Sequence, residues 1–196
     1  AAVASGEVPL ELGTDTGGSV RQPASYCGVV GIKPTYGAVS RYGVVPMSNT
    51  FDQVGVFGRD VRDAVLMLNA VTGHDIKDAT SAQRISPALL IDKDNSKDAN
   101  FLKGLRVALP KEYVEFAPSN KNIQTLFDEA VKVFEESGAI IEYVSLPHLK
   151  YALETYYIIT TAEVSSNMSR YDGVRYGHRA KDYETLTELY INSRTE

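Results

Sequence analysis

A strand–helix–strand pattern over residues 105–145 most constrains what this chain can fold into. Residues 105–109 predict a short strand, and residues 140–144 predict the next one. Between them, from Asn120 to Gly138, apolar side chains recur at the three- and four-residue spacing of a helix. Two strands joined through a helix in this way usually pair in parallel. The sequence therefore predicts an α/β protein with a largely parallel sheet.

Other segments extend this prediction on both sides. Residues 8–12 indicate a strand, and the glycine-rich residues 26–58 indicate loops and short strands. A helix is predicted from an Asp60 cap to Gly73. Its expected apolar stripe is Val61, Ala64, Val65 and Leu68. Residues 75–104 are polar and broken, which predicts a surface excursion. Further helices are expected over 148–169 and 182–196.

The loop after the first predicted strand is the best candidate for chemistry. It consists of residues 13–21, with the sequence GTDTGGSVR. A hydroxyl nucleophile needs an exposed oxygen, a base, and N–H groups aimed at the developing oxyanion. Gly17 and Gly18 before Ser19 permit a tight, open backbone in which several N–H groups converge. The same geometry could instead cradle a phosphate.

Known glycine-rich patterns do not fit this loop. A P-loop requires a lysine after its second glycine, but Ser19 follows Gly18 directly. A nucleophile elbow requires a glycine where Arg21 stands. The dinucleotide-binding fingerprint does not match either. A Gly-Gly-Ser loop by itself is more often a plain turn, so the short pattern leaves catalysis, anion binding and a simple turn open.

Composition excludes several other classes of protein. With 43% hydrophobic and 23% charged residues, the chain is typical of a globular protein rather than a disordered one. Its net charge of −5 is unfavourable for binding a nucleic-acid backbone without a partner protein. Cys27 is the single cysteine, which excludes an internal disulfide and a cysteine-based metal site, and no metal is expected. Without a membrane-spanning run or signal peptide, the chain is expected in the cytoplasm.

Longer strings around the loop resemble the amidase signature family. The core of the resemblance is residues 13–24 (GTDTGGSVRQPA) and 27–35 (CGVVGIKPT). Further segments resemble one subgroup, the A subunits of tRNA-dependent amidotransferases; they are residues 36–43, 52–55, 156–159, 163–167 and 170–177. Only the stretch near 80–104 lies outside the resemblance. It implies an α/β/α sandwich with a mixed, largely parallel central sheet. Residues 1–196 would be the central part of a single amidase domain, truncated at both ends.

The resemblance also implies a mechanism. Ser19 would attack an amide carbonyl, form an acyl-ester and release ammonia. The backbone N–H groups of Thr16, Gly17, Gly18 and Ser19 would form the oxyanion hole. In the subgroup the amide is that of glutamine, and the ammonia converts Glu-tRNA(Gln) or Asp-tRNA(Asn) to Gln-tRNA(Gln) or Asn-tRNA(Asn).

The resemblance places some of the other site residues in this chain and others outside residues 1–196. Asp15 and Arg21 are expected to be a structural pair that holds the loop. The family's base is a lysine that acts through a serine on a cis peptide, a Ser–cisSer–Lys triad. The lysine and the cis-peptide serine are both expected upstream of residue 1. Lys33 is not the catalytic lysine, because it lies in a structural part of the motif. The isolated 196 residues are therefore expected to be inactive.

Substrate and partner assignments follow from the same resemblance. Tyr156 or Tyr157 is a candidate to line the glutamine pocket, and a core aromatic on a helix is an equally good reading. The charged groups that hold glutamine are expected after Glu196. No cofactor is expected in this chain, whereas ATP and magnesium would bind a partner subunit. The expected partners are the B and C subunits of a heterotrimer, with aminoacyl-tRNA bound mainly by the partner subunit.

Two alternatives stay open at this point. One is a stand-alone amidase of the same family, because the string over residues 170–177 favours the amidotransferase subgroup without deciding it. The other is a noncatalytic module in which the Gly17–Gly18 loop binds an anion or a nucleotide. Nucleotide binding that survives Ser19→Ala, with amidase activity unchanged, would favour the second alternative.

Overall fold

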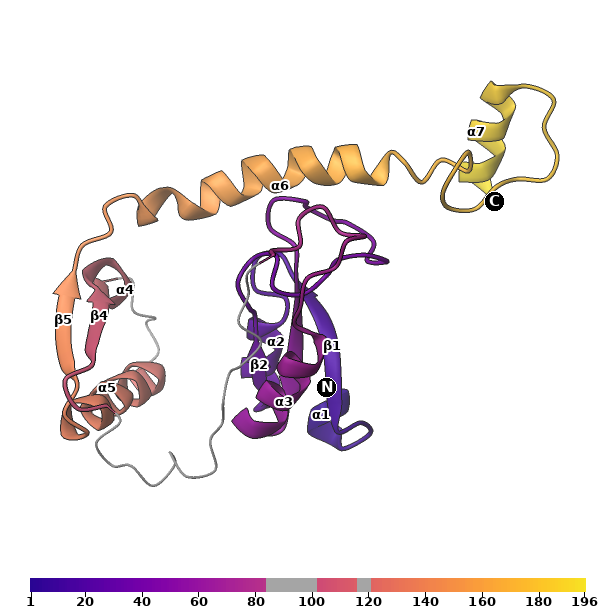
Figure 1. Cartoon of the computed structure of the whole chain (residues 1–196). Coiled ribbons are helices and arrows are strands. Elements are labelled where there is room, and N and C mark those ends of the chain that lie inside the picture. The colour runs from indigo at the N-terminus through magenta and orange to yellow at the C-terminus, as the bar shows by residue number, and fades with distance from the viewer. Residues whose placement is uncertain (84–101, 116–120) are drawn as a thin grey trace. The chain divides into compact units, whose positions relative to one another are not determined.

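The computed structural model describes residues 1–83, 102–115 and 121–196, which fall into two compact units. The first unit is built from residues 1–83 and 156–196, and the second from the described residues between 102 and 155. Figure 1 shows the helices and strands of each unit. The predicted surface excursion over 75–104 lies mostly outside the described residues.

The first unit contains a three-stranded antiparallel sheet in the order β1–β3–β2. Its strands are β1 (Leu10–Asp15), β2 (Val30–Ile32) and β3 (Gln53–Gly58). The central strand β3 is buried along almost its whole length. Its side chains Val54 and Val56 pack into a small core with Val39, Ala64 and Leu68. Helices α1 (Ala2–Ser5) and α2 (Arg21–Cys27) complete the N-terminal part of the unit.

Helix α3 (Val61–Val71) supplies the helical side of this core. Its start is confirmed as predicted, since the Asp60 side chain accepts a hydrogen bond from the Asp63 N–H at 2.9 Å. Ala64, Val65 and Leu68 are buried, but Val61 is 59% exposed, so the predicted stripe was wrong at that residue. A helical side chain leans over the turn that precedes it, and at the first helical position no such turn exists.

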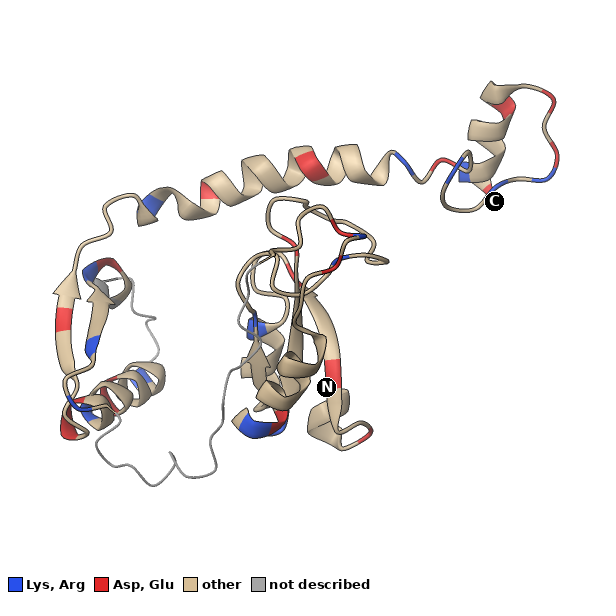
Figure 2. Cartoon of the chain, in the orientation of Figure 1, with Lys and Arg blue, Asp and Glu red and all other residues tan. Residues whose placement is uncertain are grey.

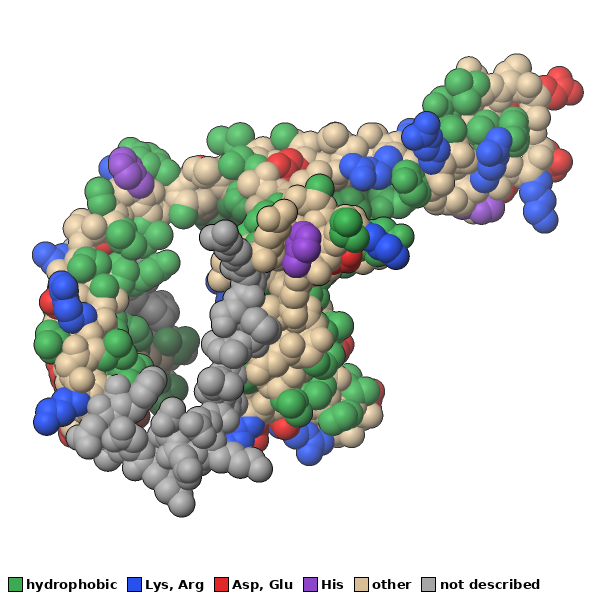
Figure 3. Space-filling model, in the orientation of Figure 1, with side chains coloured by type: hydrophobic (Ala, Val, Ile, Leu, Met, Phe, Trp, Pro, Cys, Tyr) green, Lys and Arg blue, Asp and Glu red, His purple; other side chains and the backbone are tan. Residues whose placement is uncertain are grey.

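The second unit confirms the predicted strand–helix–strand unit. Strands β4 (Arg106–Pro110) and β5 (Ile140–Val144) pair in parallel. Between them lie α4 (Lys111–Glu115) and α5 (Lys121–Glu136). None of the described side chains of α5 is buried, and Figure 3 shows apolar side chains exposed on this unit. The α/β class is confirmed; parallel pairing holds for β4–β5, whereas the first unit's strands pair antiparallel.

The remaining helices differ from their predictions at the ends. A 3-10 turn, η2 (Leu149–Tyr151), leads into α6 (Ala152–Met168), as expected for residues 148–169. Helix α7 (Leu186–Thr195) begins four residues later than predicted, because Thr185 and Glu188 form a reciprocal capping box there. No described helix combines the length and the hydrophobicity that a membrane span requires. Figure 2 shows acidic and basic residues interspersed along the ribbon.

Candidate active site

The Ser19 loop, defined as residues 16–19, joins the end of β1 to the region where α2 begins. Strand β1 runs to Asp15, which is three residues further than the sequence predicted, and α2 was not predicted at all. Asp15 is fully buried at the end of its strand. Its two carboxylate oxygens accept hydrogen bonds from the N–H groups of Gly18 (2.8 Å), Val20 (3.2 Å) and Arg21 (3.3 Å). One carboxylate thereby fixes the chain from Gly18 to Arg21.

Arg21 completes the structural pair that the sequence predicted. Its Nε donates to Asp15 Oδ2 at 3.0 Å, and its terminal nitrogen donates to Oδ1 at 3.1 Å. Burial by itself raises the pKa of Asp15, but the hydrogen bonds from Arg21 and Val20 and the Arg21 charge outweigh it, so the net pKa lies below its ordinary value. Asp15 is therefore a charged carboxylate at neutral pH, which suits it to accept five donors.

Ser19 lies exposed at the end of this loop. Within the described residues, its hydroxyl and the N–H groups of Gly17 and Ser19 have no protein acceptor, whereas the N–H of Gly18 is donated to Asp15. Gly18 has a φ of +135°, which an L side chain rarely adopts. Of the four predicted oxyanion donors, Gly18 is thus the one taken up by a protein acceptor among the described residues, whereas the N–H groups of Thr16, Gly17 and Ser19 are open. The roles assigned to Ser19 and to the oxyanion donors stay predictions.

Tyr156 of α6 covers the backbone of the loop at Gly17. A Cβ added at Gly17 would lie 2.7 Å from Tyr156 Cζ and 2.8 Å from its hydroxyl oxygen. The ring also packs against Phe51, with centroids 5.7 Å apart. Tyr157 stacks edge-on against Tyr156 and is 57% exposed. Of the two candidate tyrosines, Tyr156 is the one that contacts the loop, while a role for either in substrate binding stays a prediction.

Asp52 gives the loop a second anchor that sequence reasoning missed. This buried carboxylate lies immediately before β3 and accepts a hydrogen bond from the Thr16 hydroxyl at 2.7 Å through Oδ1. Its Oδ2 accepts from the N–H groups of Met47 (2.8 Å) and Ser48 (3.0 Å). The resemblance had included Asp52 without giving it a role. No spacing in the sequence links it to Thr16, since 36 residues separate them.

One face of α6 is polar where it contacts the N-terminal part of the first unit. The residues on this face are Tyr156, Thr160, Glu163 and Asn167. Their spacing of four, three and four residues places them in a line along the helix. Thr160 and Asn167 are buried, and Asn167 donates to the Met47 carbonyl at 3.1 Å. The polar spacing of these residues was the sequence signal available for Glu163 and Asn167.

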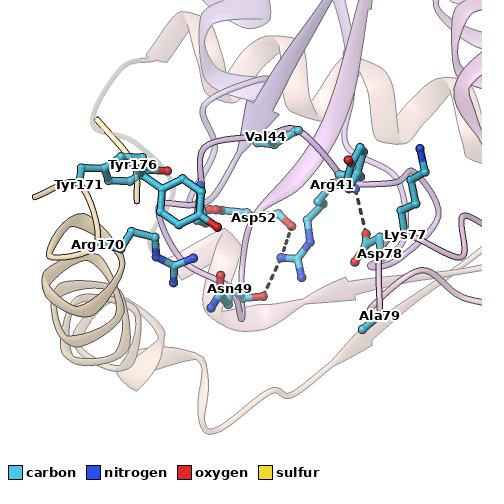
Figure 4. Close-up of a pocket in the computed structure, with 13 residues that line it drawn as sticks. Arg41, Val44, Asn49, Asp52, Lys77, Asp78, Ala79, Arg170, Tyr171 and Tyr176 are labelled. Atoms are coloured by element: carbon cyan, nitrogen blue, oxygen red, sulfur yellow. Dashed lines mark hydrogen bonds between the residues drawn. The ribbon is translucent and has the colours of Figure 1, made fainter. Parts of the chain in front are cut away.

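A cavity of about 620 Å³ lies next to Asp52 (Figure 4). The Arg41 side chain projects into it and donates to the carbonyls of Asn49 (2.7 Å) and Asp52 (3.3 Å). The backbone N–H of Arg41 donates to the carboxylate of Asp78 at 2.9 Å. Arg170 and the rings of Tyr171 and Tyr176 form the other side in Figure 4. Ser19 is not among the residues that line this cavity.

Metal binding has no candidate residues in the described part of the chain. No group of three or more His, Cys, Asp or Glu side chains there is arranged to hold a metal ion. Asp15 and Asp52, the buried carboxylates of the site, are instead occupied by N–H and hydroxyl donors.

Comparisons with known proteins agree with this geometry. The sequence model of the Amidase family matches residues 1–196. The chain is 50% identical, over its whole length, to the A subunits of the glutamyl-tRNA(Gln) amidotransferases of Carboxydothermus hydrogenoformans and of Streptococcus pneumoniae serotype 19F. It spans 39% of the length of each of these relatives.

Solved structures give the same result. The A subunit of glutamyl-tRNA(Gln) amidotransferase from Thermotoga maritima matches with a TM-score of 0.77 at 45% identity, over 86% of this chain and 36% of that one. The native peptide amidase from Stenotrophomonas maltophilia matches with a TM-score of 0.72 at 32% identity, over 87% of this chain and 34% of that one. The fold, the Ser19 loop and these matches agree, and the chain belongs to the amidase family.

Proposed function

We propose that these residues are the central part of the A subunit of a tRNA-dependent amidotransferase. In this role the protein hydrolyses glutamine at Ser19 and supplies ammonia to convert Glu-tRNA(Gln) or Asp-tRNA(Asn) to the amidated product. The observation that carries the proposal is the loop closed by Asp15, which leaves the Ser19 hydroxyl exposed and the Gly17 and Ser19 N–H groups unused by protein acceptors. The names of the two curated relatives support the same role.

The chemistry follows from the loop. Ser19 Oγ attacks the amide carbon of glutamine, and its proton passes to the lysine–serine pair that the family resemblance implies outside residues 1–196. The carbonyl oxygen becomes an oxyanion facing Gly17 and Ser19, whose N–H groups stabilise it. One such donor is typically worth about 2.7–4 kcal/mol in the transition state. The C–N bond then breaks as the lysine–serine pair returns the proton to the nitrogen, ammonia leaves, and water hydrolyses the Ser19 ester to glutamate.

Tyr156 is the described side chain best placed to limit the space for glutamine. Its ring is in contact with Gly17, so a substrate carbonyl bound over the loop would lie beside it. The aromatic face excludes water from one side of the reacting carbonyl, which strengthens the electrostatic effect of the N–H donors. Tyr157, being exposed, is the weaker of the two candidates.

The proposed role brings partners with it. The B and C subunits would complete a heterotrimer, and ATP and magnesium would be used in a partner subunit, where the tRNA-bound carboxyl group is activated. The acidic balance of this chain agrees with tRNA being held mainly by the partner. A cytoplasmic location goes with this role, since aminoacyl-tRNA is consumed there.

Labelling of the full-length protein with an electrophilic glutamine analogue tests the nucleophile. Peptide mass spectrometry is expected to locate the label on Ser19, and Ser19→Ala is expected to abolish it. Ser25→Ala is the matched control, because Ser25 is also exposed and lies on the adjoining helix α2. A label on another residue, or labelling that survives Ser19→Ala, would contradict the proposal.

The stand-alone amidase is a second candidate, supported by the likeness to the peptide amidase. Purified protein assayed with glutamine and with peptide amides, each with and without the B and C subunits, separates the two functions. Glutamine hydrolysis that depends on the other subunits favours the amidotransferase. Efficient hydrolysis of peptide amides by the single chain favours the stand-alone enzyme.

A further inference from the structure

Glu163 on α6 binds a turn that lies 113 to 115 residues earlier in the sequence. Its carboxylate accepts hydrogen bonds from the hydroxyl groups of Ser48 and Thr50 and from the Thr50 N–H at 3.0 Å. The bonds from Ser48 and Thr50 lower the pKa of Glu163, so the group is a carboxylate at neutral pH. Three donors from one turn therefore converge on a single half-buried carboxylate of α6.

The turn that Glu163 binds is closed from the other side by Asp52. Ser48 is fully buried, and its N–H donates to Asp52 Oδ2 at 3.0 Å. Its carbonyl accepts the N–H groups of Asp52 (2.8 Å) and Phe51 (3.2 Å). Ser48 thus connects the two carboxylates, with its hydroxyl on Glu163 and its backbone on Asp52. A displacement of Ser48 would displace Asp52 as well.

Asp52 in turn holds the Ser19 loop at its first residue. Its Oδ1 accepts the Thr16 hydroxyl at 2.7 Å, and Thr16 directly precedes Gly17. Asp15 closes the loop from Gly18 onward. The Gly17 N–H, one of the open donors, is therefore positioned between two buried carboxylates, and only the Asp15 side is local in sequence.

Helix α6 reaches this loop by two routes. Tyr156 contacts Gly17 directly, and Glu163 lies seven residues further, two turns along the same face. We propose that Glu163 is a positioning residue for glutamine hydrolysis: through Ser48, Asp52 and Thr16 it fixes the backbone that carries the oxyanion donors. This inference rests on the proposed function of the Ser19 loop. Glu163 itself contacts no reacting atom.

The competing explanation is that Glu163 only fastens α6 to the turn that contains Ser48 and Thr50. Both explanations expect a loss of stability when Glu163 is removed. Only positioning expects a lower kcat with an unchanged KM, because misplaced donors weaken transition-state binding more than ground-state binding. Positioning also expects the loop backbone to loosen at Thr16 and Gly17, next to Asp52.

Kinetics of glutamine hydrolysis by the full-length protein make the first test. Glu163→Ala is expected to lower kcat about 10- to 100-fold, since a misplacement of about 1 Å can cost roughly 100-fold, with KM within about twofold. Glu163→Gln is expected to be intermediate, because its amide oxygen can still accept the Thr50 N–H. Glu154→Ala, the same charge change at an exposed position of α6, is the matched control and is expected to behave as wild type.

A double-mutant cycle with Thr16→Val tests the route. If Glu163 acts through the Thr16 hydroxyl, the combined variant is expected to be no slower than the slower single variant. Independent effects would instead multiply. An unchanged kcat in Glu163→Ala, or a kcat loss that multiplies with that of Thr16→Val, overturns the proposal.

Hydrogen exchange separates this inference from the proposed function. In peptides that cover residues 13–21, Glu163→Ala is expected to speed amide exchange several-fold, whereas Glu154→Ala is expected to leave it unchanged. If the wild-type protein fails to hydrolyse glutamine, the proposed function fails and exchange still measures whether Glu163 orders the loop. Unchanged exchange in Glu163→Ala overturns the positioning role whatever the activity.

Discussion

Two ion pairs, one in each unit, differ in burial far more than in length. Asp15 and Arg21 are joined at 3.0 Å around a carboxylate with no exposed surface, although Arg21 itself is 54% exposed. Arg106 and Glu142 are joined at 2.6 Å, with 72% and 40% of their side chains exposed. The longer of the two ion pairs is that of Asp15, whose carboxylate also accepts three backbone N–H groups of the loop region. What a pair contributes therefore depends on its surroundings rather than on its distance.

The largest expected effect is that of Asp15→Asn. The new amide would present N–H groups to donors that now face a carboxylate, leaving buried N–H groups of the loop unpaired. We expect a loss of about 3 kcal/mol in the free energy of unfolding, the lower end for a broken buried pair, because Arg21 can still be hydrated. Glutamine hydrolysis is expected to be nearly abolished. Urea unfolding and kinetics of the full-length protein measure both.

Glu142→Gln in the second unit is the matched control for that comparison. Its pair is exposed, so its unfolding midpoint and activity are expected to stay close to those of the wild type. Equal losses of stability in Asp15→Asn and Glu142→Gln would mean that burial does not determine how much an ion pair contributes.

The pH dependence of stability gives a second test of the Asp15 carboxylate. The folded pKa of Asp15 lies below its ordinary value of 3.8, so the stability that this carboxylate contributes is fully present above the ordinary value. That stability is lost as the pH falls through the folded pKa. The difference in the free energy of unfolding between wild type and Asp15→Asn should be constant from about pH 7 to about pH 5, and it should become smaller below about pH 4. A gap that widens in acid would contradict the assignment.

Gly17→Ala is expected to have the next largest effect, and mainly on activity. The new methyl group would lie 2.7 Å from the Tyr156 ring, so the loop or the ring must move. If the Gly17 N–H is an oxyanion donor as proposed, displacing it is expected to lower kcat about 10²- to 10³-fold. Gly104→Ala in the second unit is the control: its φ of +78° makes alanine strained, but nothing lies within 4 Å of the new methyl group. It is expected to cost about 1 kcal/mol of stability and no activity.

The two units also differ in how far the sequence predicted them. In the second unit, hydrophobic periodicity located β5 to the residue and β4 within one residue, because those elements are encoded locally. In the first unit the loop was identified from its glycines, and the pairing of Asp15 with Arg21 was expected. The links of Thr16 to Asp52 and of Ser48 to Glu163 join segments far apart in sequence, so no local pattern could predict them.

Thr160→Val is expected to have the smallest effect, in the opposite direction. The Thr160 hydroxyl is buried on the polar face of α6, and within the described residues it has no hydrogen-bond partner. Valine keeps the branched shape and removes an unsatisfied polar group, so stability is expected to stay the same or to rise by about 1 kcal/mol. Thermal unfolding measures this. A clear loss of stability would mean that the hydroxyl has a partner in the full-length protein, and that the polar face continues unbroken from Tyr156 to Asn167.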